Sequence, residues 1–488
     1  MVTSGHLPKG LALLRAKVAS SILRVLRIEG SSMIKITKFG GSSVSSAGQF
    51  KKVKAIVQAD PSRRFVVVSA AGKRDKFDSK ITDLLYLVNA HLQYHVTCDD
   101  LLGTIGQRFC EIAKELNLSY PISHEFGIFR ELAKRGEYTP EYIVSRGEYF
   151  TGRMMAEYLG FPFVDAADVI TFRADSSIDM DKTSEKLKAA IGEEKCFVLP
   201  GFYGATEDGK IKLLDRGGGD ITGAIVAQCL GADLYENWTD VSGFLTADPR
   251  IVDNPKSISR ITYAELRELS YMGASVLHEE AIFPVKDAGI PLVIKNTNAP
   301  DDPGTVISEE TEPGVAEPLI TGIAGKKDFV AIHVKTNHMS SKVGYIRKTL
   351  SIFERYRVSI EHIPTGIDSF AVVVQGSDVK DCLYSIVADI KSELEPDEIK
   401  IVDRLALIST VGRNMPSRPG TSGRLFGELG HAGINIRMIA QGSEELDIVV
   451  GVDVDDFERA IRVIYGAFVD SDDNIITFEE AEEEATNE

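Results

Sequence analysis

A lysine followed closely by two glycines stands at the end of a predicted β-strand near the start of the chain. Apolar alternation predicts the strand over 33–37, and apolar residues at helical spacing predict a helix over 45–59. Between them runs Lys38-Phe39-Gly40-Gly41-Ser42-Ser43-Val44. Glycines let backbone N–H groups approach an anion, and a helix N-terminus favours negative charge. The stretch predicts either a phosphate-binding turn with Lys38 as a mobile cation or a plain turn beside a surface lysine, and it matches neither the Walker nor the dinucleotide fingerprint.

A second glycine-rich junction, Arg216-Gly217-Gly218-Gly219-Asp220, separates a strand-like stretch from a small-residue helix over 224–230. Further along, a predicted strand ends in Thr239 and Asp240, and the loop after it carries Arg250. The carboxyl ends of parallel strands meet at one edge of a sheet, where open α/β folds bind ligands. These residues are therefore predicted to converge with the first turn on one site.

One carboxylate and one basic loop are candidates for the same site. Ser145-Arg146-Gly147-Glu148 opens an otherwise apolar helix within a region, 83–160, that is predicted to be mainly helical. Glu148 is interpreted either as a capping residue that complements the helix dipole or as an acceptor for a substrate ammonium. The loop 73–80 carries four basic residues after a buried strand predicted over 65–72. This loop is either a solvated surface or one that attracts an anionic substrate.

The composition excludes several classes of protein. The 488 residues, 43% of them hydrophobic and 26% charged, fit a globular chain of about three domains. A net charge of −17 argues against a nucleic-acid-binding surface. Five scattered cysteines, none in C-x-x-C spacing, predict a reducing, cytoplasmic location with neither a disulfide framework nor a zinc site. No apolar run approaches the length of a membrane span.

Three segments are predicted to lie outside the folded domains. Residues 1–32 have five basic residues against the single acid Glu29, and they predict either an organellar transit peptide or an over-extended start before Met33, which is favoured. Residues 309–319 lie in a stretch rich in Glu and Pro and predict an interdomain linker. The acidic tail 479–488 is expected to be disordered.

An internal repeat follows the linker. Val358–Ile363 matches Ile434–Ile439, 76 residues later, and the same offset pairs Gly344 with Gly420. Each unit is predicted to run strand, loop, helix, strand, strand, helix, which is the ferredoxin-like order. The predicted domains are a catalytic α/β domain at 33–308, a first ferredoxin-like domain at 320–395 and a second at 396–478.

Together these residues resemble the aspartate kinases, members of the amino acid kinase family, followed by two ACT domains. The resemblance runs from Met33 to Phe478, and it rests on five motifs in the family's order and approximate spacing: 38–44, 145–148, 216–220, 239–243 and 248–250. It implies a three-layer αβα sandwich around a mainly parallel sheet, followed by two ferredoxin-like (βαββαβ) ACT domains. It also implies transfer of the γ-phosphoryl of ATP to the side-chain carboxylate of L-aspartate, giving 4-phospho-L-aspartate, the first step of lysine, threonine and methionine biosynthesis.

A carboxylate is already a nucleophile at neutral pH, so this reaction needs positioning and charge neutralisation and no general base. The resemblance implies that the transferring phosphoryl is neutralised by Lys38 and the Gly40 and Gly41 amides, with Asp220 orienting the lysines. The implied aspartate contacts are Glu148 to the α-ammonium, Arg216 to the α-carboxylate, and the hydroxyls of Ser42 and Thr82. The implied nucleotide contacts are Thr239, Asp240 and Arg250. Mg²⁺ is expected on phosphate oxygens and water, without a dedicated ligand cluster.

The chain also departs from the family pattern. Relatives often carry a lysine near Val-Leu-His-Pro, and Ser275 occupies its place here. We hypothesise that Lys295, in the nucleotide-side loop, supplies the missing positive charge. Leu245 stands where many relatives have an aromatic residue near the nucleotide, and the insertion 73–80 lengthens the loop before Thr82.

ACT pairs in this family bind end-product amino acids at an interface between units, commonly between subunits, which implies feedback inhibition and at least a homodimer. The implied effector contacts are Met339, Gly344, Ile346, Glu361 and Thr365, with core packing as the alternative for Met339 and Ile346. Lysine, threonine, methionine or a combination stays open as the effector. No dehydrogenase follows the ACT units, so the kinase alone is expected.

Two competing functions stay open on the sequence. One is another amino acid kinase, acting on glutamate, carbamate or a nucleoside monophosphate, against which the tandem ACT units and the 145–148 motif argue. The other is a non-catalytic amino-acid sensor, which only Ser275 supports.

Overall fold

The computed structural model describes residues 33–192, 195–215, 217–274, 277, 282–309, 317–416, 418–470 and 475–476. The predictions for the leader 1–32, Arg216, Ser275, most of the linker and the acidic tail fall outside these residues. Across the described residues, no helix is long and apolar enough to cross a membrane. The chain divides into two compact units, one of Met1–Asp240 and Glu280–Asp302, the other of Val241–Glu279 and Pro303–Glu488.

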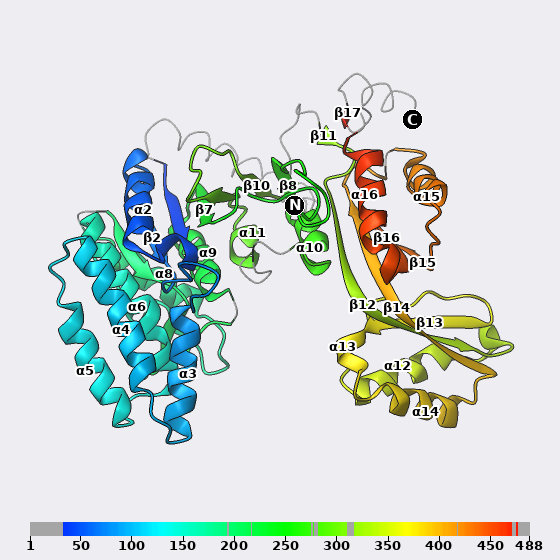
Figure 1. Ribbon diagram of the computed structural model, residues 1–488, viewed down its shortest axis with the longest axis horizontal. Helices are drawn as coiled ribbons and strands as arrows, with labels where there is room; N and C mark the ends of the chain where they lie inside the picture. The colour runs from blue at the N-terminus through cyan, green and yellow to red at the C-terminus, as the bar shows by residue number, and fades with distance from the viewer. Residues whose placement is uncertain are drawn as a thin grey trace, which may run out of the picture. The chain divides into compact units, whose positions relative to one another are not determined.

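The first unit alternates strands with helices, and its helices α3 to α6 run side by side as a bundle (Figure 1). Its elements are β1 (Lys35–Phe39), η1 (Gly41–Val44), α2 (Ala47–Ala59), β2 (Arg63–Val68), α3 (Ile81–Gln93), α4 (Asp99–Glu115), α5 (Ile122–Lys134), α6 (Pro140–Leu159), α7 (Ala166–Val169), β3 (Thr171–Phe172), α8 (Met180–Ala190), β4 (Phe197–Pro200), β5 (Tyr203–Thr206), β6 (Ile211–Leu213), α9 (Gly218–Leu230), β7 (Leu234–Thr239), α11 (Phe283–Asp287) and β9 (Leu292–Asn296). The strand and helix predicted around Lys38 are β1 and α2, and the helical prediction over 83–160 is confirmed.

A sheet of parallel strands in the order β4-β2-β1-β7-β9 forms the centre of this unit. Successive side chains of a strand point to opposite faces. Phe39 therefore stacks on Trp238, with ring centroids 6.0 Å apart, in the core that the α2 side of the sheet buries, while Lys38 reaches α9 on the other face. The α/β prediction is confirmed, and the strand ends meet at one edge as expected.

The second unit contains both predicted repeats together with the segment 241–279. Its elements are β8 (Arg260–Thr262), α10 (Tyr263–Tyr271), β10 (Thr305–Ser308), β11 (Glu317–Pro318), β12 (Gly322–Lys335), η3 (Met339–Ser341), α12 (Tyr345–Arg355), β13 (Ser369–Gln375), α13 (Gly376–Val379), α14 (Leu383–Leu394), β14 (Glu398–Val411), α15 (Thr421–His431), β15 (Met438–Gln441), β16 (Asp447–Asp453), η4 (Val454–Asp456), α16 (Phe457–Phe468) and β17 (Ile475–Ile476). Residues 241–279 and 303–308, which the sequence analysis assigned to the catalytic domain, thus pack with the repeats. The reason is apolar packing, since Ala247 and Val252 are buried in the same core as α16.

The two repeats share one antiparallel sheet, in the order β13-β12-β14-β16-β15. Strands β12 and β14 are 14 residues long and run through both repeats. Each has a register irregularity beside a residue with positive φ, Asp328 at 72° and Arg404 at 58°. Because an extra residue shifts the alternation of side chains, Ile323 and Ile332 face the same side of the sheet. Helices α15 and α16 cover that side in one repeat, and α12 and α14 cover it in the other.

A buried carboxylate, Glu265, joins α10 to the ends of two strands of the second unit. It is fully buried and accepts from Thr321 Oγ1 at 2.5 Å, from the Thr262 backbone at 2.9 Å and from the Arg413 backbone at 3.2 Å, and it also forms an ion pair with the Arg413 guanidinium. Removing one charge of such a pair leaves the other buried without compensation. Glu265 therefore fixes how α10 packs on the five-stranded sheet of the second unit.

We expect Glu265→Gln to lower the free energy of unfolding by about 3 kcal/mol, because the Arg413 charge stays buried. Urea denaturation measures this. Glu268→Gln on the same helix is the matched control, because burial already raises the pKa of Glu268 and its neutralisation should be harmless. Equal stabilities of the two variants would contradict the role assigned to Glu265.

Candidate active site

The turn after β1 lies against the loop that follows β2. The Gly72 backbone N–H donates to the Gly41 carbonyl at 2.8 Å, and a Cβ at Gly72 would lie 2.6 Å from the Gly41 carbonyl carbon. A Cβ at Gly41 would lie 3.0 Å from the Ala70 carbonyl oxygen. The two backbones are therefore in direct contact, and only glycine fits at Gly72. The Gly40 N–H, however, donates to the Trp238 carbonyl at 2.9 Å, so of the two amides predicted to face a phosphate only that of Gly41 stays available.

A buried charge network lies beside this turn. Lys38 is 6% exposed, forms an ion pair with Asp220 through its Nζ, and donates to Asn237 Oδ1 at 3.4 Å. Asn237 Nδ2 in turn donates to Asp220 Oδ1 at 2.8 Å. The Lys38 ammonium is also 3.5 Å from the position that a Cβ on Gly40 would occupy. The network holds one ammonium at the turn, so Lys38 is neither the mobile cation nor the surface lysine that the sequence predicted, because Asp220 and Asn237 fix its buried Nζ.

Asn237 is a member of this network that the sequence did not single out. It lies in β7 in register with Lys38 of β1, so both side chains point to the α9 face. Its position two residues before Thr239 is the signal that sequence reasoning missed, because that spacing places it on the same face of the strand as Thr239.

Helix α9 brings Asp220 to the network through a glycine-rich start. Gly217 has φ 81°, in the left-handed region that favours glycine, and a Cβ at Gly219 would lie 2.7 Å from Ser69 Oγ. The Tyr235 hydroxyl donates to the Asp220 carbonyl at 3.0 Å. The glycines thus let the N-terminus of α9 approach the loop after β2.

Glu148 lies in α6 and is 4% exposed. Among the described residues, its Oε2 has no hydrogen-bond partner. Burial raises the pKa of Glu148 to about 8, although the Ala70 backbone and the Arg146 charge oppose the shift. A Cβ at Gly147 would lie 2.9 Å from the Ala70 Cβ, so glycine there lets α6 approach this loop. A buried carboxylate with an unused oxygen is suited to receive a cation.

The capping interpretation of Glu148 is wrong. Helix α6 begins at Pro140, its N-cap is Thr139, whose side chain accepts from the Tyr142 backbone, and Glu141 is the acid of its first turn. Glu148 lies two turns further on, beyond the range of the helix dipole.

The predicted hydroxyl contacts flank the same turn. Ser42 lies in η1, and its carbonyl accepts from Ser45 Oγ at 3.1 Å. Thr82 is half-buried in the first turn of α3, next to Ile81, whose backbone N–H donates to the Ala71 carbonyl at 3.1 Å. The loop 73–80 is exposed except for Asp78, which is half-buried, and it begins and ends beside this turn.

The predicted nucleotide residues of the first unit lie at the ends of β7 and β9. Thr239 Oγ1 donates to Asp240 Oδ1 at 3.1 Å, and the Thr239 carbonyl accepts from the Thr297 backbone at 2.9 Å. The Thr297 hydroxyl is 2.7 Å from the Ser43 hydroxyl. This contact joins the end of β9 to the turn formed by Gly40–Val44, called the phosphate turn below.

The side chain of Lys295 does not point toward that of Lys38. It is in register with Trp238 in β7, and its ammonium lies 5.6 Å from the centroid of that ring and donates to the Asp302 carbonyl. Burial lowers the pKa of Lys295. The two lysines therefore lie on opposite faces of the sheet.

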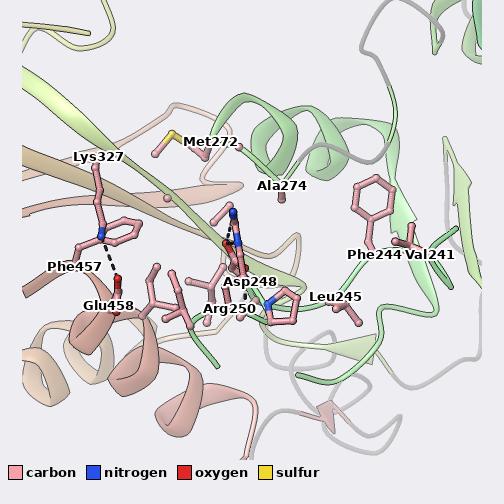
Figure 2. A pocket seen from close by; sticks show the side chains of 18 of the residues that line it. Val241, Phe244, Leu245, Asp248, Arg250, Met272, Ala274, Lys327, Phe457 and Glu458 are labelled. Carbon is pink, nitrogen blue, oxygen red and sulfur yellow. Dashed lines mark hydrogen bonds and ion pairs between the residues drawn. The ribbon is translucent and has the colours of Figure 1, made fainter. Parts of the chain in front are cut away.

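Arg250 belongs to the second unit and lines a cavity of about 670 Å³ there (Figure 2). Its guanidinium pairs with Asp248 at 2.6 Å. Leu245 lines the same cavity, and the opposite wall carries Lys327 and Glu458, which form an ion pair at 3.1 Å (Figure 2). The loop around Arg250 is attached to α16, because Arg462 Nε donates to the Ile251 carbonyl at 2.8 Å.

The five predicted effector residues have different surroundings in the second unit. Met339 is buried in the core of the first repeat and Ile346 packs against it, which agrees with the core alternative. Gly344 precedes α12 with φ 78°, and Glu361 accepts from the Tyr271 hydroxyl at 2.6 Å. Of the five, only Thr365 lines a cavity of about 260 Å³ on the sheet face opposite to the helices.

The site geometry suits phosphoryl transfer. The Gly41 amide, one buried ammonium and the N-terminus of α9 lie at the turn and can stabilise negative charge, while Glu148 can hold a cation nearby. Since no proton must be removed from a carboxylate nucleophile, this set of groups is chemically sufficient for transfer to a carboxylate.

Comparisons with known proteins agree with this geometry. The model of the amino acid kinase family matches residues 33–296, and that of an ACT domain matches 408–468. Aspartokinase 3 of Bacillus subtilis is 35% identical over 449 residues, which cover 89% of this chain and 98% of the relative. The crystal structure of Clostridium acetobutylicum aspartate kinase is 47% identical with a TM-score of 0.84, and the match covers 90% of this chain and 100% of that one.

Aspartokinase III of E. coli is a more distant relative. Its complex with aspartate and ADP is 25% identical with a TM-score of 0.68, covering 89% of this chain and 99% of that one. Its complex with lysine and aspartate is 25% identical with a TM-score of 0.70, covering 90% and 100%.

Proposed function

This chain belongs to the amino acid kinase family as an aspartate kinase, and from that premise we propose how its residues transfer the γ-phosphoryl of ATP to the side-chain carboxylate of L-aspartate. The observation that carries the proposal is the Lys38–Asp220–Asn237 network beside the Gly40-Gly41 turn. Lys38 and the Gly41 amide bind the phosphoryl oxygens and stabilise the charge that they carry in the transition state. Asp220 and Asn237 hold the ammonium in place.

Aspartate is bound by Glu148 through its α-ammonium, with Arg216 for its α-carboxylate and Ser42 and Thr82 for hydroxyl contacts. Glu148 supports this assignment because it is buried, it has an oxygen without a partner among the described residues, and it lies against the loop that touches Gly41. Thr239 and Asp240 bind the nucleotide in the first unit, and the nucleotide contact of Arg250, in the second unit, rests on the family resemblance alone. Mg²⁺ would be bound to the ATP phosphates and would reduce their negative charge. The buried Lys38 ammonium would neutralise phosphate charge at the same place.

The activity is tested by aspartate-dependent ADP release at saturating MgATP, with hydroxylamine trapping of the acyl phosphate. We expect turnover with aspartate and none with glutamate, whose longer side chain displaces the carboxylate from the turn. Turnover with glutamate alone would favour another amino acid kinase, and no turnover with either would favour an amino-acid sensor.

We propose feedback inhibition through the ACT units and a homo-oligomer, on the grounds of the ACT match and the complex of E. coli aspartokinase III with lysine. Met339, Gly344, Ile346, Glu361 and Thr365 are the proposed effector contacts. The same ADP-release assay with lysine, threonine and methionine added singly and in pairs identifies the effector, and sedimentation with and without it gives the oligomeric state.

Lys295 is proposed to supply nucleotide-side charge in place of the lysine that Ser275 replaces. We expect Lys295→Ala to raise the KM for MgATP about tenfold, the loss of one charge-assisted contact of about 1.4 kcal/mol, and to leave the KM for aspartate unchanged. Lys295→Met is the second test variant: it keeps an apolar side chain against Trp238 and removes only the charge, so it should show the same rise in KM. Unchanged turnover and unchanged KM for MgATP in both variants would show that the assignment is wrong.

A further inference from the structure

Arg108 is a buried arginine that the proposed mechanism does not use. It lies in the middle of α4 and is 3% exposed. Its guanidinium donates to the Gly72 carbonyl at 2.5 Å and to the Ser79 carbonyl at 2.6 Å, and its Nη2 is 3.4 Å from an Asp78 oxygen. Burial lowers the pKa of Arg108, so the cation is held at a cost in solvation.

The two carbonyls mark the two ends of one loop. Residues 73–77, 79 and 80 are exposed, Asp78 is half-buried, and the loop carries the basic side chains Lys73, Arg74, Lys76 and Lys80. The Ile81 backbone N–H donates to the Ala71 carbonyl at 3.1 Å, which closes the base of the loop. Arg108 lies beneath this closure and binds both ends at once. A planar guanidinium can do this because its donors point in fixed, diverging directions.

The start of the loop touches the phosphate turn. Gly72 donates to the Gly41 carbonyl at 2.8 Å, while its own carbonyl accepts from Arg108. The end of the loop leads directly into α3, where Thr82 lies. Arg108 and the Ile81–Ala71 backbone bond therefore together hold the turn at Gly41 near the first turn of α3, and these are two sides of the proposed aspartate site.

The loop also has a link of its own that does not depend on Arg108. Arg74 donates to Asp78 through its backbone at 3.0 Å and through its Nε at 2.9 Å, and it also pairs with Glu111 of α4 at 3.3 Å. The side chains of Arg74 and Glu111 are 43% and 44% exposed, so the ion pair between them contributes little. The contact that fixes the loop is the buried one.

We propose that Arg108 is the positioning residue of the aspartate site: it holds both ends of the 73–80 loop so that Gly72 supports Gly41 and Thr82 faces the substrate. The proposal rests on the proposed function, in which Gly41 and Thr82 contact phosphoryl and aspartate. A displacement of about 1 Å at reacting groups costs up to about 100-fold in rate, so a residue that touches no substrate can still control turnover.

The test uses Arg108→Lys and Arg108→Met in the full chain. Lysine keeps the charge but cannot donate to both carbonyls in the fork geometry of arginine. We expect kcat/KM for aspartate to fall at least about tenfold in both, with the KM for MgATP changed less than about twofold. Trypsin should also cut the folded variants within 73–80 at least about ten times faster than the wild type, because the loop opens more often.

Glu111→Gln is the matched control, since it lies on the same helix and contacts Arg74 of the loop but makes no bond to Arg108. It should keep both KM values and the wild-type trypsin pattern. If Arg108→Met fails to fold, Arg108→Lys carries the test. Equal rises in both KM values, or wild-type kinetics with wild-type proteolysis, would overturn the proposal. A wild-type enzyme that does not phosphorylate aspartate would instead overturn the proposed function.

Discussion

Lys38→Met is expected to lower kcat by about 1,000-fold, the loss of one preorganised charge at the transferring phosphoryl, worth about 4 kcal/mol. The ammonium is buried, is held by Asp220 and Asn237, and lies at the Gly40 turn, so water cannot replace it. The KM for aspartate should change little, since Lys38 is assigned to the phosphoryl and not to aspartate. Aspartate-dependent ADP release at saturating substrates measures the effect.

Loss of folding is the alternative explanation that this experiment must exclude. Removing the ammonium leaves the Asp220 carboxylate without its ion partner, which destabilises the fold. The double variant Lys38→Met with Asp220→Asn removes both charges and should recover the melting temperature without recovering turnover. A kcat within tenfold of the wild type in the single variant would refute the role of Lys38.

Glu148→Gln is expected to raise the KM for aspartate about 100-fold, because a charge-assisted bond to the α-ammonium, worth about 3 kcal/mol, is lost. The amide has nearly the same size as the carboxyl, so the packing of α6 against Ala70 stays intact. Glu141→Gln is the matched control, because it lies in the first turn of the same helix and is exposed. A KM for aspartate that rises equally in both variants would contradict the assignment.

The pH dependence follows from the raised pKa of Glu148. With a pKa of about 8, the carboxyl is protonated in the free enzyme at neutral pH, and binding of an ammonium requires its ionised form. The KM for aspartate should therefore fall about tenfold per pH unit between pH 6 and pH 7.5 and level off above pH 8. The Glu148→Gln variant should lose this slope, and a wild-type KM that is flat over this range would contradict the assignment.

The raised pKa of Glu148 also makes stability depend on pH, and a rise in pH that improves aspartate binding lowers the stability of the fold. Between pH 4.5 and about 8, Glu148 keeps its proton in the folded protein but has released it in the unfolded chain, where its pKa is 4.5. The contribution of Glu148 to the free energy of unfolding therefore falls as the pH rises through this range. Glu148→Gln should therefore be at least as stable as the wild type at pH 8, even though it binds aspartate poorly. Melting temperatures of both proteins at pH 5 and pH 8 check this, and the difference between the two pH values should be smaller in the variant.

Much of the candidate site could be predicted from the sequence, because its residues stand at the ends of strands that the local pattern of apolar residues identifies. Lys38, Gly41 and Asp220 belong to motifs whose chemistry follows from residue type, and parallel strands bring their ends to one edge whatever the loops do. The ferredoxin-like repeats were predictable from a fixed offset. The boundary of α6 was not, since nothing in the apolar pattern placed the helix start at Pro140 and removed Glu148 from a capping role.

Residue type and spacing thus determined the chemistry to expect of this protein: a turn with a lysine for a phosphate, a carboxylate for an ammonium, and a repeat of ferredoxin-like order. Only the tertiary structure decided which residues meet. The alternation of a strand is local, but the register between strands is set by distant packing, and it places Lys295 on the Trp238 face, away from Lys38, and Asn237 beside Lys38. The attachment of the Arg250 loop to α16 and the role of Arg108 under a distant loop follow from contacts across large sequence separations, which no local pattern encodes.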